Sequence, residues 1–154
     1  MREILFKAKR IDNGEWVEGY LFRKYYQELP HDRLVIQYKT MSNEYEWTPR
    51  YMVAEIDENT ICQYTGLTDK NGNKIWENDI VKKHFYTDYD ACANSEEYTG
   101  VVKFMDCAWV IEFKRDIHIC AIPIIESITY SHDIEYFEVI GNIFDNPELI
   151  GGGE

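Results

Sequence analysis

The stretch ICQYTGLTDKNGNKIWENDIV, residues 61–81, decides the fold, because it places two apolar segments on either side of an Asn-Gly turn. Gly66 and Leu67 close the first segment, and turn-forming residues follow at positions 69–72. The second segment contains Ile75, Trp76, Ile80 and Val81. An Asn-Gly pair between such segments is a strong short-range signal for a β-hairpin. The stretch therefore predicts a hairpin that leads into a further strand.

Two more hairpins are predicted on the N-terminal side of this stretch. Residues 3–9 alternate between apolar and polar side chains, and an Asn-Gly turn at 13–14 separates them from the strand-like segment 15–22. Segments 34–38 and 44–48 are separated by five residues, which predicts a second hairpin with a five-residue loop.

Three other segments do not follow a clear strand pattern. Residues 50–60 fit neither the helical nor the strand period, so a turn of helix and a short edge strand both stay open. Residues 86–99 are polar and acidic, which is typical of an exposed, mobile loop. Near the C-terminus, Asn146 is suited to cap a single helical turn that begins at Pro147 and packs Leu149 and Ile150.

The remaining apolar segments predict a mainly β protein. Short antiparallel strands are expected at 100–104, 108–113, 117–122 and 136–143, in a barrel or a sandwich. A chain of 154 residues suits one domain with a core of its own. We expect residues 1–150 to form one cooperative unit, with an N-terminal hairpin region at 1–60, a second region at 61–150 and a tail at 151–154.

Composition and charge limit the classes of function. The 28 acidic and 16 basic residues give a net charge of −12, which disfavours direct binding to nucleic acid or to anionic membranes. No apolar stretch approaches the roughly 20 residues of a membrane helix, and the first ten residues lack the apolar core of a signal peptide. The four cysteines follow no zinc or redox spacing, so reduced thiols, a cytoplasmic location and no cofactor are expected.

Three blocks of sequence carry a resemblance to a known family. They are FKAKRIDNGEWVEGYLF at 6–22, TGLTDKNGNKIWENDIV at 65–81 and EVIGNIFDNPELI at 138–150. Together they resemble the YopX family of bacteriophage and prophage proteins over most of the chain, with 22–50 and 84–99 as variable stretches. One departure is Asn78, where glycine is usual, although asparagine also adopts the left-handed conformation.

The resemblance implies an SH3-like β-barrel from about residue 61 onward, preceded by the N-terminal hairpins, and self-association into a homo-oligomer. It assigns no activity. It also marks motif residues whose role is unknown: Gln63, Tyr64, Thr65, Gly66, Asp69, Asn71, Gly72, Glu77, Asp79, Gly141, Asn142 and Pro147.

Candidate metal ligands among these residues have a simpler explanation. Asp69, Glu77 and Asp79 could bind a divalent cation, but their spacing does not match a calcium loop, and Asp and Asn side chains commonly stabilise turns. We therefore favour a structural role. A second group, His84, Asp88, Asp90 and Cys92, lacks the pattern of a zinc module and is interpreted as a solvated loop.

No catalytic residue is assigned, because the Walker A, GxGxxG and GxSxG motifs do not occur. The four tryptophans are expected in the core, because an aromatic platform for nucleic acid normally requires a basic groove.

The sequence supports three hypotheses on function. The first is a non-enzymatic phage accessory protein that binds an unknown protein, or itself, through an exposed aromatic and acidic surface. The second is an acidic DNA mimic that inhibits a host nucleic-acid-binding protein, and it predicts carboxylates gathered on one face. The third is a metal-dependent hydrolase that uses Asp69, Glu77 and Asp79.

Overall fold

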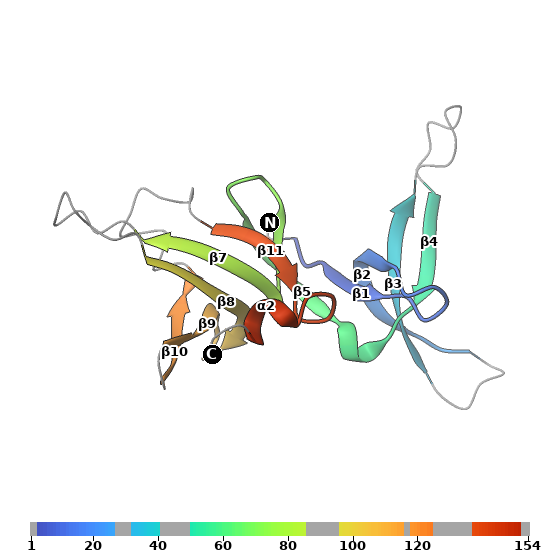
Figure 1. Cartoon of the computed structure of the whole chain (residues 1–154). Coiled ribbons are helices and arrows are strands. Elements are labelled where there is room, and N and C mark those ends of the chain that lie inside the picture. Colours follow the sequence, from blue (N-terminus) through green and yellow to red (C-terminus); the bar gives the residue numbers. More distant parts are fainter. Residues whose placement is uncertain are drawn as a thin grey trace. The chain divides into compact units, whose positions relative to one another are not determined.

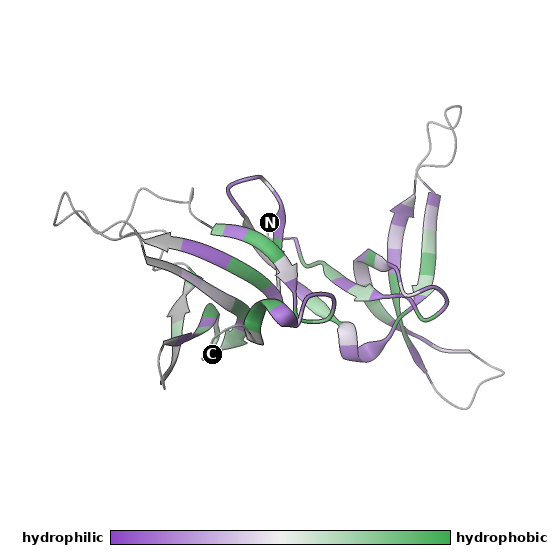
Figure 2. Ribbon diagram, in the orientation of Figure 1, coloured by the Kyte–Doolittle hydropathy of each residue, from purple (hydrophilic) through white to green (hydrophobic). Residues whose placement is uncertain are grey.

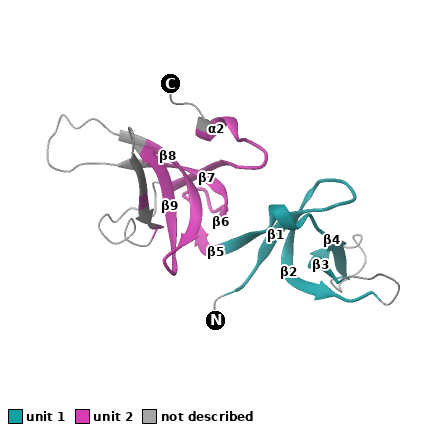
Figure 3. Cartoon of the chain, turned by 90° about the horizontal axis from the view of Figure 1, so that it is seen from below, with its two compact units in different colours: residues 1–64 teal, residues 65–154 magenta. Residues whose placement is uncertain are grey.

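The computed structural model describes six stretches of the chain: residues 3–26, 32–40, 50–85, 96–115, 118–124 and 137–151 (Figure 1). The chain divides into two compact units, Met1–Tyr64 and Thr65–Glu154 (Figure 3). Antiparallel strands make up most of both units, which confirms the mainly β prediction. Each unit is described by itself below.

The first sheet has six strands in the order β4-β3-β2-β1-β5-β6, and unit 1 contains β4 to β1 and the beginning of β5. Its elements are β1 (Phe6–Lys9), β2 (Trp16–Lys24), β3 (Arg33–Thr40), β4 (Arg50–Glu55), a 3₁₀ turn (Glu58–Thr60) and the beginning of β5 (Cys62–Thr68). The predicted first hairpin is confirmed, with Ala8 opposite Val17. At its turn, Gly14 has a φ of 72°, as the Asn-Gly signal indicates.

The core of unit 1 follows from side-chain alternation along these strands. Apolar residues on one face of the sheet gather into a cluster of Ala8, Val17, Ile36, Ala54 and Ile56. Figure 2 shows hydrophobic and hydrophilic residues mixed along each strand, as expected when a strand has one buried face.

The predicted second hairpin is wrong in its second strand. Strand β3 pairs with β4 at 50–55, where Thr40 lies opposite Arg50, and not with 44–48, which lies outside the described residues. Of the two alternatives for 50–60, the edge strand is therefore confirmed at Arg50–Glu55, and a 3₁₀ turn follows at Glu58–Thr60. The period of the strand is unclear in the sequence because Ala54 is buried, whereas Tyr51, Met52 and Val53 stay exposed on both faces of an edge strand.

Unit 2 contains the end of β5 and a second antiparallel sheet with the order β10-β9-β8-β7-β11. Its elements are β6 (Lys74–Trp76), β7 (Asp79–Phe85), β8 (Glu96–Met105), β9 (Ala108–Arg115), β10 (His118–Pro123), β11 (Phe137–Asn142) and the short helix α2 (Glu148–Gly151). The central hairpin and the later strands are thus confirmed. Between β8 and β9, Asp106 and Cys107 both have positive φ, as a two-residue hairpin turn requires.

Two predictions for this unit need correction. Strand β8 begins at Glu96, inside the predicted loop, because Glu96 and Glu97 pair with the end of β7 despite their charge. The rest of that loop, 86–95, lies outside the described residues. At the C-terminus, Leu149 and Ile150 are 38% and 48% exposed, so the helical turn forms without burying them.

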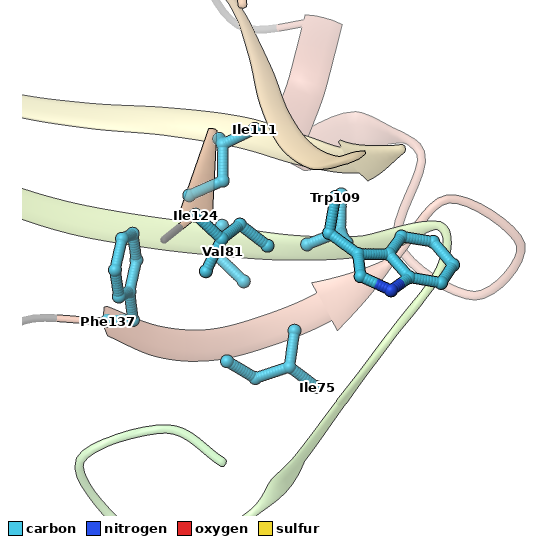
Figure 4. Close-up of a cluster of buried hydrophobic side chains, with 7 residues drawn as sticks. Ile75, Val81, Trp109, Ile111, Ile124 and Phe137 are labelled. Atoms are coloured by element: carbon cyan, nitrogen blue, oxygen red, sulfur yellow. The ribbon is translucent and has the colours of Figure 1, made fainter. Parts of the chain in front are cut away.

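The core of unit 2 is larger than that of unit 1. Figure 4 shows it as a cluster of Ile75, Val81, Val102, Trp109, Ile111, Ile124 and Phe137. The described strands form open sheets and no closed barrel, so the SH3-like barrel is not confirmed. In the described part of the chain, no helix is long and apolar enough to cross a membrane.

Cooperativity between the units stays a prediction, and strand β5 gives it a physical basis. The strand pairs with β1 through Cys62 and Gln63, and it continues into unit 2, where the Thr65 hydroxyl donates to the carbonyl of Ile75 (2.8 Å). Melting either unit would therefore remove the support for one end of the same strand.

We predict that Ile36→Ala in unit 1 and Ile80→Ala in unit 2 each shift one common unfolding transition. Both side chains are 0% exposed, so each substitution should cost about 2–5 kcal/mol of unfolding free energy. Urea unfolding followed by tryptophan fluorescence and by circular dichroism tests this. Two transitions, each moved by only one of the substitutions, would show that the units unfold independently.

Candidate functional site

The buried side chain of Asp69 joins two of the family-like blocks. This side chain is 4% exposed and follows β5 at the start of the Asn-Gly turn. Its Oδ1 accepts hydrogen bonds from the backbone N–H groups of Asn71 (2.9 Å) and Asn73 (2.8 Å). Its Oδ2 accepts from the backbone N–H of Val139 in β11 (3.1 Å) and from the side-chain amide of Asn73 (3.1 Å). The carboxylate thus holds its own turn and joins it to a strand 70 residues away.

The charge of Asp69 is maintained by these donors. Burial by itself would raise the pKa of the carboxyl group, but the backbone N–H groups of Val139, Asn73 and Asn71, with the Asn73 amide, outweigh it. The net effect lowers the pKa of Asp69 below its ordinary value. A carboxylate with this many donors stabilises the folded chain in its ionised form.

The next residue adds a second connection to the same strand. The backbone N–H of Lys70 donates to the carbonyl of Phe137 (3.0 Å). Its ammonium group forms an ion pair with Glu138 (2.6 Å), and the hydrogen bond from Lys70 lowers the pKa of that carboxyl group. Both side chains are about one-third exposed, so this pair contributes little stability beyond fixing the position of the turn.

The carboxylate of Asp79, the second acidic motif residue, also accepts a hydrogen bond from the backbone. The Asp79 side chain is 1% exposed, and its Oδ2 accepts from the N–H of Trp76 (2.8 Å), which closes the tight connection between β6 and β7. Within this connection Asn78 has a φ of 65°, so asparagine does replace the usual glycine in the left-handed conformation. Asn78 also donates to the carbonyl of Val102 and accepts from the N–H of Ile143.

The third block of the motif stabilises the turn after β11. A side chain at Gly141 would place its Cβ 2.5 Å from Oδ1 of Asn146, so this close approach requires glycine. The side chain of Asn142 accepts from the N–H groups of Phe144 and Asp145 (3.0 Å each). Pro147 is exposed, and its carbonyl accepts from Ile150 in the first turn of α2.

The other motif residues also have positions that the fold explains. Gln63 pairs with Phe6, and the N–H of Tyr64 donates to the carbonyl of Leu5. Gly66 and Gly72 have φ of 88° and 82°. Glu77 is half-buried between β6 and β7. The motif is therefore a set of turn and strand contacts, as the structural interpretation of Asp69 and Asp79 predicted.

The candidate metal groups are not brought together in the described residues. There, no group of three or more His, Cys, Asp or Glu side chains could hold a metal ion. Asp69 and Asp79 direct carboxylate oxygens at backbone N–H groups, which an ion would have to displace. Asp88, Asp90 and Cys92 lie outside the described residues, as does the side chain of His84.

One open pocket of about 820 Å³ lies in unit 1, next to the turn between β1 and β2 and the 3₁₀ turn. Its rim mixes three cations with three anions: Lys9, Arg10, Arg33, Asp32, Asp57 and Glu58. Arg10 is already paired with the Asp12 carboxylate (2.9 Å from Nε). Such a rim favours neither an anionic nor a cationic ligand.

The most unusual surface of unit 1 is apolar and lies on β2 and β4. Tyr51, Met52 and Val53, three consecutive residues of the edge strand, are 57%, 43% and 40% exposed. Tyr20 and Phe22 of β2 are 52% and 40% exposed. Tyr51 and Val53 share one face of the sheet with Tyr20 and Phe22, whereas Met52 lies on the other face. Exposed apolar side chains that gather on one surface are typical of interaction sites. Sequence reasoning missed this surface, although the run YMVA at 51–54 was the signal that could have revealed it.

The tryptophans divide between core and surface. Trp76 and Trp109 are 5% and 8% exposed in unit 2, as expected of core residues. Trp16 of β2 is half-buried, with the ammonium groups of Lys7 and Lys9 over its ring at 5.1 and 5.5 Å from the centroid. Trp47 lies outside the described residues.

Comparison with known proteins gives a family and a similar fold. The family model described as YopX protein matches residues 5–151. A crystal structure, that of protein EF1440 from Enterococcus faecalis, is similar with a TM-score of 0.51 and 23% sequence identity, over 97% of this chain and 99% of that chain. At this identity the likeness concerns the fold alone. No curated protein matches the chain.

We predict that Asp69→Asn lowers the unfolding free energy by about 2–4 kcal/mol at pH 7, because an amide cannot accept from all the donors of the carboxylate. Since the folded pKa lies below the unfolded value of about 3.9, the contribution of ionised Asp69 is present above that value. It is lost as the pH falls through the folded pKa.

Urea unfolding between pH 7 and pH 2 tests this. The loss of stability below about pH 4 should be smaller in Asp69→Asn than in the wild type. Asp106→Asn, which removes a negative charge from an exposed turn, is the matched control. Equal pH dependence in Asp69→Asn and in the wild type would contradict the structural role of this carboxylate.

Proposed function

The chain belongs to the YopX family, and we propose that it is a non-enzymatic phage or prophage accessory protein that binds another protein, or a second copy of itself, along strand β4. The observation that carries the proposal is the exposed apolar run at Tyr51–Val53 on an edge strand. We place its action in the cytoplasm of the bacterial host, and we retain the SH3-like barrel as the proposed form of unit 2.

The open part of β4 is short and well defined. At its C-terminal end, the carbonyl of Glu55 accepts from Ile11, and Asp57 donates to Lys9, so these positions are joined to the end of β1. Before them, residues 50–54 pair with β3 on one side, and the described residues supply no strand on the other. This stretch offers backbone N–H and C=O groups next to apolar side chains.

Such an edge is suited to strand addition. A partner chain that lies along β4 gains backbone hydrogen bonds, and alternate side chains contribute specificity. Exposed edges are commonly protected by charged residues or by proline, and Tyr51, Met52 and Val53 provide neither. The cost of leaving this edge in water supports a partner that covers it. A metal-dependent hydrolase has less support, because backbone N–H groups occupy the carboxylates of Asp69 and Asp79.

We predict that Met52→Lys weakens binding of the retained partner at least tenfold. A partner that covers β4 would remove the new ammonium group from water, which is costly. Tagged protein is incubated with untagged protein and with bacterial lysate, and the retained chains are quantified. Ile11→Lys is the matched control, since Ile11 is an apolar residue of the same unit and is 58% exposed. Retention by Met52→Lys equal to that by the wild type, or no retention by the wild type, would contradict the proposal.

The distribution of charge supports a second candidate, the acidic DNA mimic. Residues 65–154 contain 17 acidic and 7 basic residues, a net charge of −10, whereas residues 1–64 contain 11 and 9, a net charge of −2. Most of the negative charge therefore belongs to unit 2. Such an imbalance favours attraction to a basic cleft.

For the mimic we predict that the wild type retains a basic nucleic-acid-handling protein from lysate, and that excess duplex DNA displaces it. Retention should decrease steeply between about 50 and 200 mM salt, because the attraction is electrostatic. A retained set without any such protein, or one that DNA leaves in place, would exclude this candidate.

A further inference from the structure

The sheet of unit 1 has a second face, opposite its core, that carries aromatic and basic side chains. The register places Tyr20 opposite Gln37, Gln37 opposite Val53, and Lys39 opposite Tyr51. Neighbouring positions in the alternation, Ile36 and Ala54, belong to the core cluster. Tyr20, Phe22, Lys39, Tyr51 and Val53 therefore share the outer side, which we call the aromatic face. Val35, opposite Phe22, lies on the same side and is 0% exposed, so the sheet is covered at that position.

The rings of the aromatic face are exposed and are distributed over β2 and β4. Tyr20 and Phe22 are two residues apart on one strand, so their Cα atoms are separated by about 7 Å. Tyr51 lies two strands away from Tyr20, about 10 Å in the direction of the backbone hydrogen bonds, and is displaced by two residues, about 7 Å, along the strands. Exposed fractions of 52%, 40% and 57% leave much of each side chain in water. Three aromatic side chains on one sheet face form a surface for flat, apolar groups.

The charge of this face is opposite to that of the whole chain. The same alternation assigns to it five cations, Lys7, Lys9, Lys24, Arg33 and Lys39, and two anions, Glu18 and Glu55. Its formal net charge is thus +3, in a chain whose net charge is −12. Arg33 is paired with Glu55 (3.2 Å), whereas Lys39 is exposed at the side of Tyr51. The sequence does not indicate a basic groove, but the register of the strands gives unit 1 a basic sheet face.

We propose that the aromatic face binds single-stranded nucleic acid without sequence preference. Unpaired bases stack on Tyr20, Phe22 and Tyr51, and Lys39 contacts the phosphates beside Tyr51. Lys24, whose ammonium lies 4.8 Å from the centroid of the Tyr26 ring, adds positive charge on the side of Phe22. Proteins that bind single strands combine these two elements, stacking rings and cations along the backbone. Duplex DNA hides the faces of its bases, so it would use only the cations of this site.

An acidic peptide is the competing ligand, and the rings argue against it. Carboxylates would satisfy the cations but would leave the exposed faces of Tyr20, Phe22 and Tyr51 without a flat partner. A base supplies that partner and its phosphate supplies the charge in one repeating unit. This binding site does not depend on strand addition, because stacking uses the face of the sheet and strand addition uses the backbone edge of β4.

The test is fluorescence anisotropy of a labelled 20-nucleotide oligothymidine titrated with the full chain at 50 mM salt. We expect Tyr20→Ala to weaken binding about 5- to 150-fold, the range for loss of one stacked base. Lys39→Ala should weaken it too and should reduce the slope of log affinity against log salt by about one. Phe104→Ala, at a 55% exposed aromatic residue of unit 2, is the matched control and should bind as the wild type does.

A second probe separates stacking from simple attraction to a polyanion. An abasic phosphodiester of the same length should bind weakly and should not distinguish Tyr20→Ala from the wild type. Equal binding of both probes, or displacement of oligothymidine by polyglutamate at equal charge, would overturn the proposal in favour of an acidic ligand. No saturable binding by the wild type would also overturn it. Circular dichroism of each variant verifies that the fold is retained.

Discussion

The buried carboxylate of Asp69 is the interaction on which unit 2 depends. Removing a charged group from water is costly, and the cost is offset only when several donors surround it. Here the donors come from two places: Asn71 and Asn73 in the same turn, and Val139 in β11. The turn and the distant strand therefore stabilise one another, since the turn supplies the carboxylate and the strand supplies one of its hydrogen-bond donors. This explains why the second and third family-like blocks belong to one structural feature.

The same dependence extends along β7. Asp79 closes its connection to β6, and Asn78 accepts from Ile143 just after β11. These contacts place β11 beside β7, where it covers the core cluster that contains Val81 and Phe137. A bulge between Val139 and Gly141 adjusts the register so that both the Asp69 contact and the close approach of Gly141 to Asn146 are possible. The hydrogen bonds of the polar motif residues thus hold the strands whose apolar side chains form the core.

Local signals in the sequence were sufficient for the hairpins but not for their distant partners. The Asn-Gly turns identify β1 with β2 and β5 with β6, because a short turn fixes its strands locally. The partner of β3 was misplaced, since an edge strand with one neighbour does not alternate cleanly, as at Tyr51–Val53. The start of β8 was missed because pairing with β7 outweighs the polarity of Glu96 and Glu97. Contact between Asp69 and Val139 depends on a sheet order that no local pattern contains.

The acidic motif residues and the residues that offer a binding surface differ in exposure. Motif side chains such as Asp69 and Asp79 are buried and occupied by backbone donors, so they have little to present to a partner. Tyr20 and Phe22 are exposed although they belong to the first family-like block, and Tyr51 is exposed on β4. The Asp69 contacts lie within unit 2, whereas the outer side of β2, β3 and β4 belongs to unit 1. The family-like blocks therefore combine buried side chains that hold turns and strands with exposed aromatic side chains, and the ligand that we propose depends on the exposed ones.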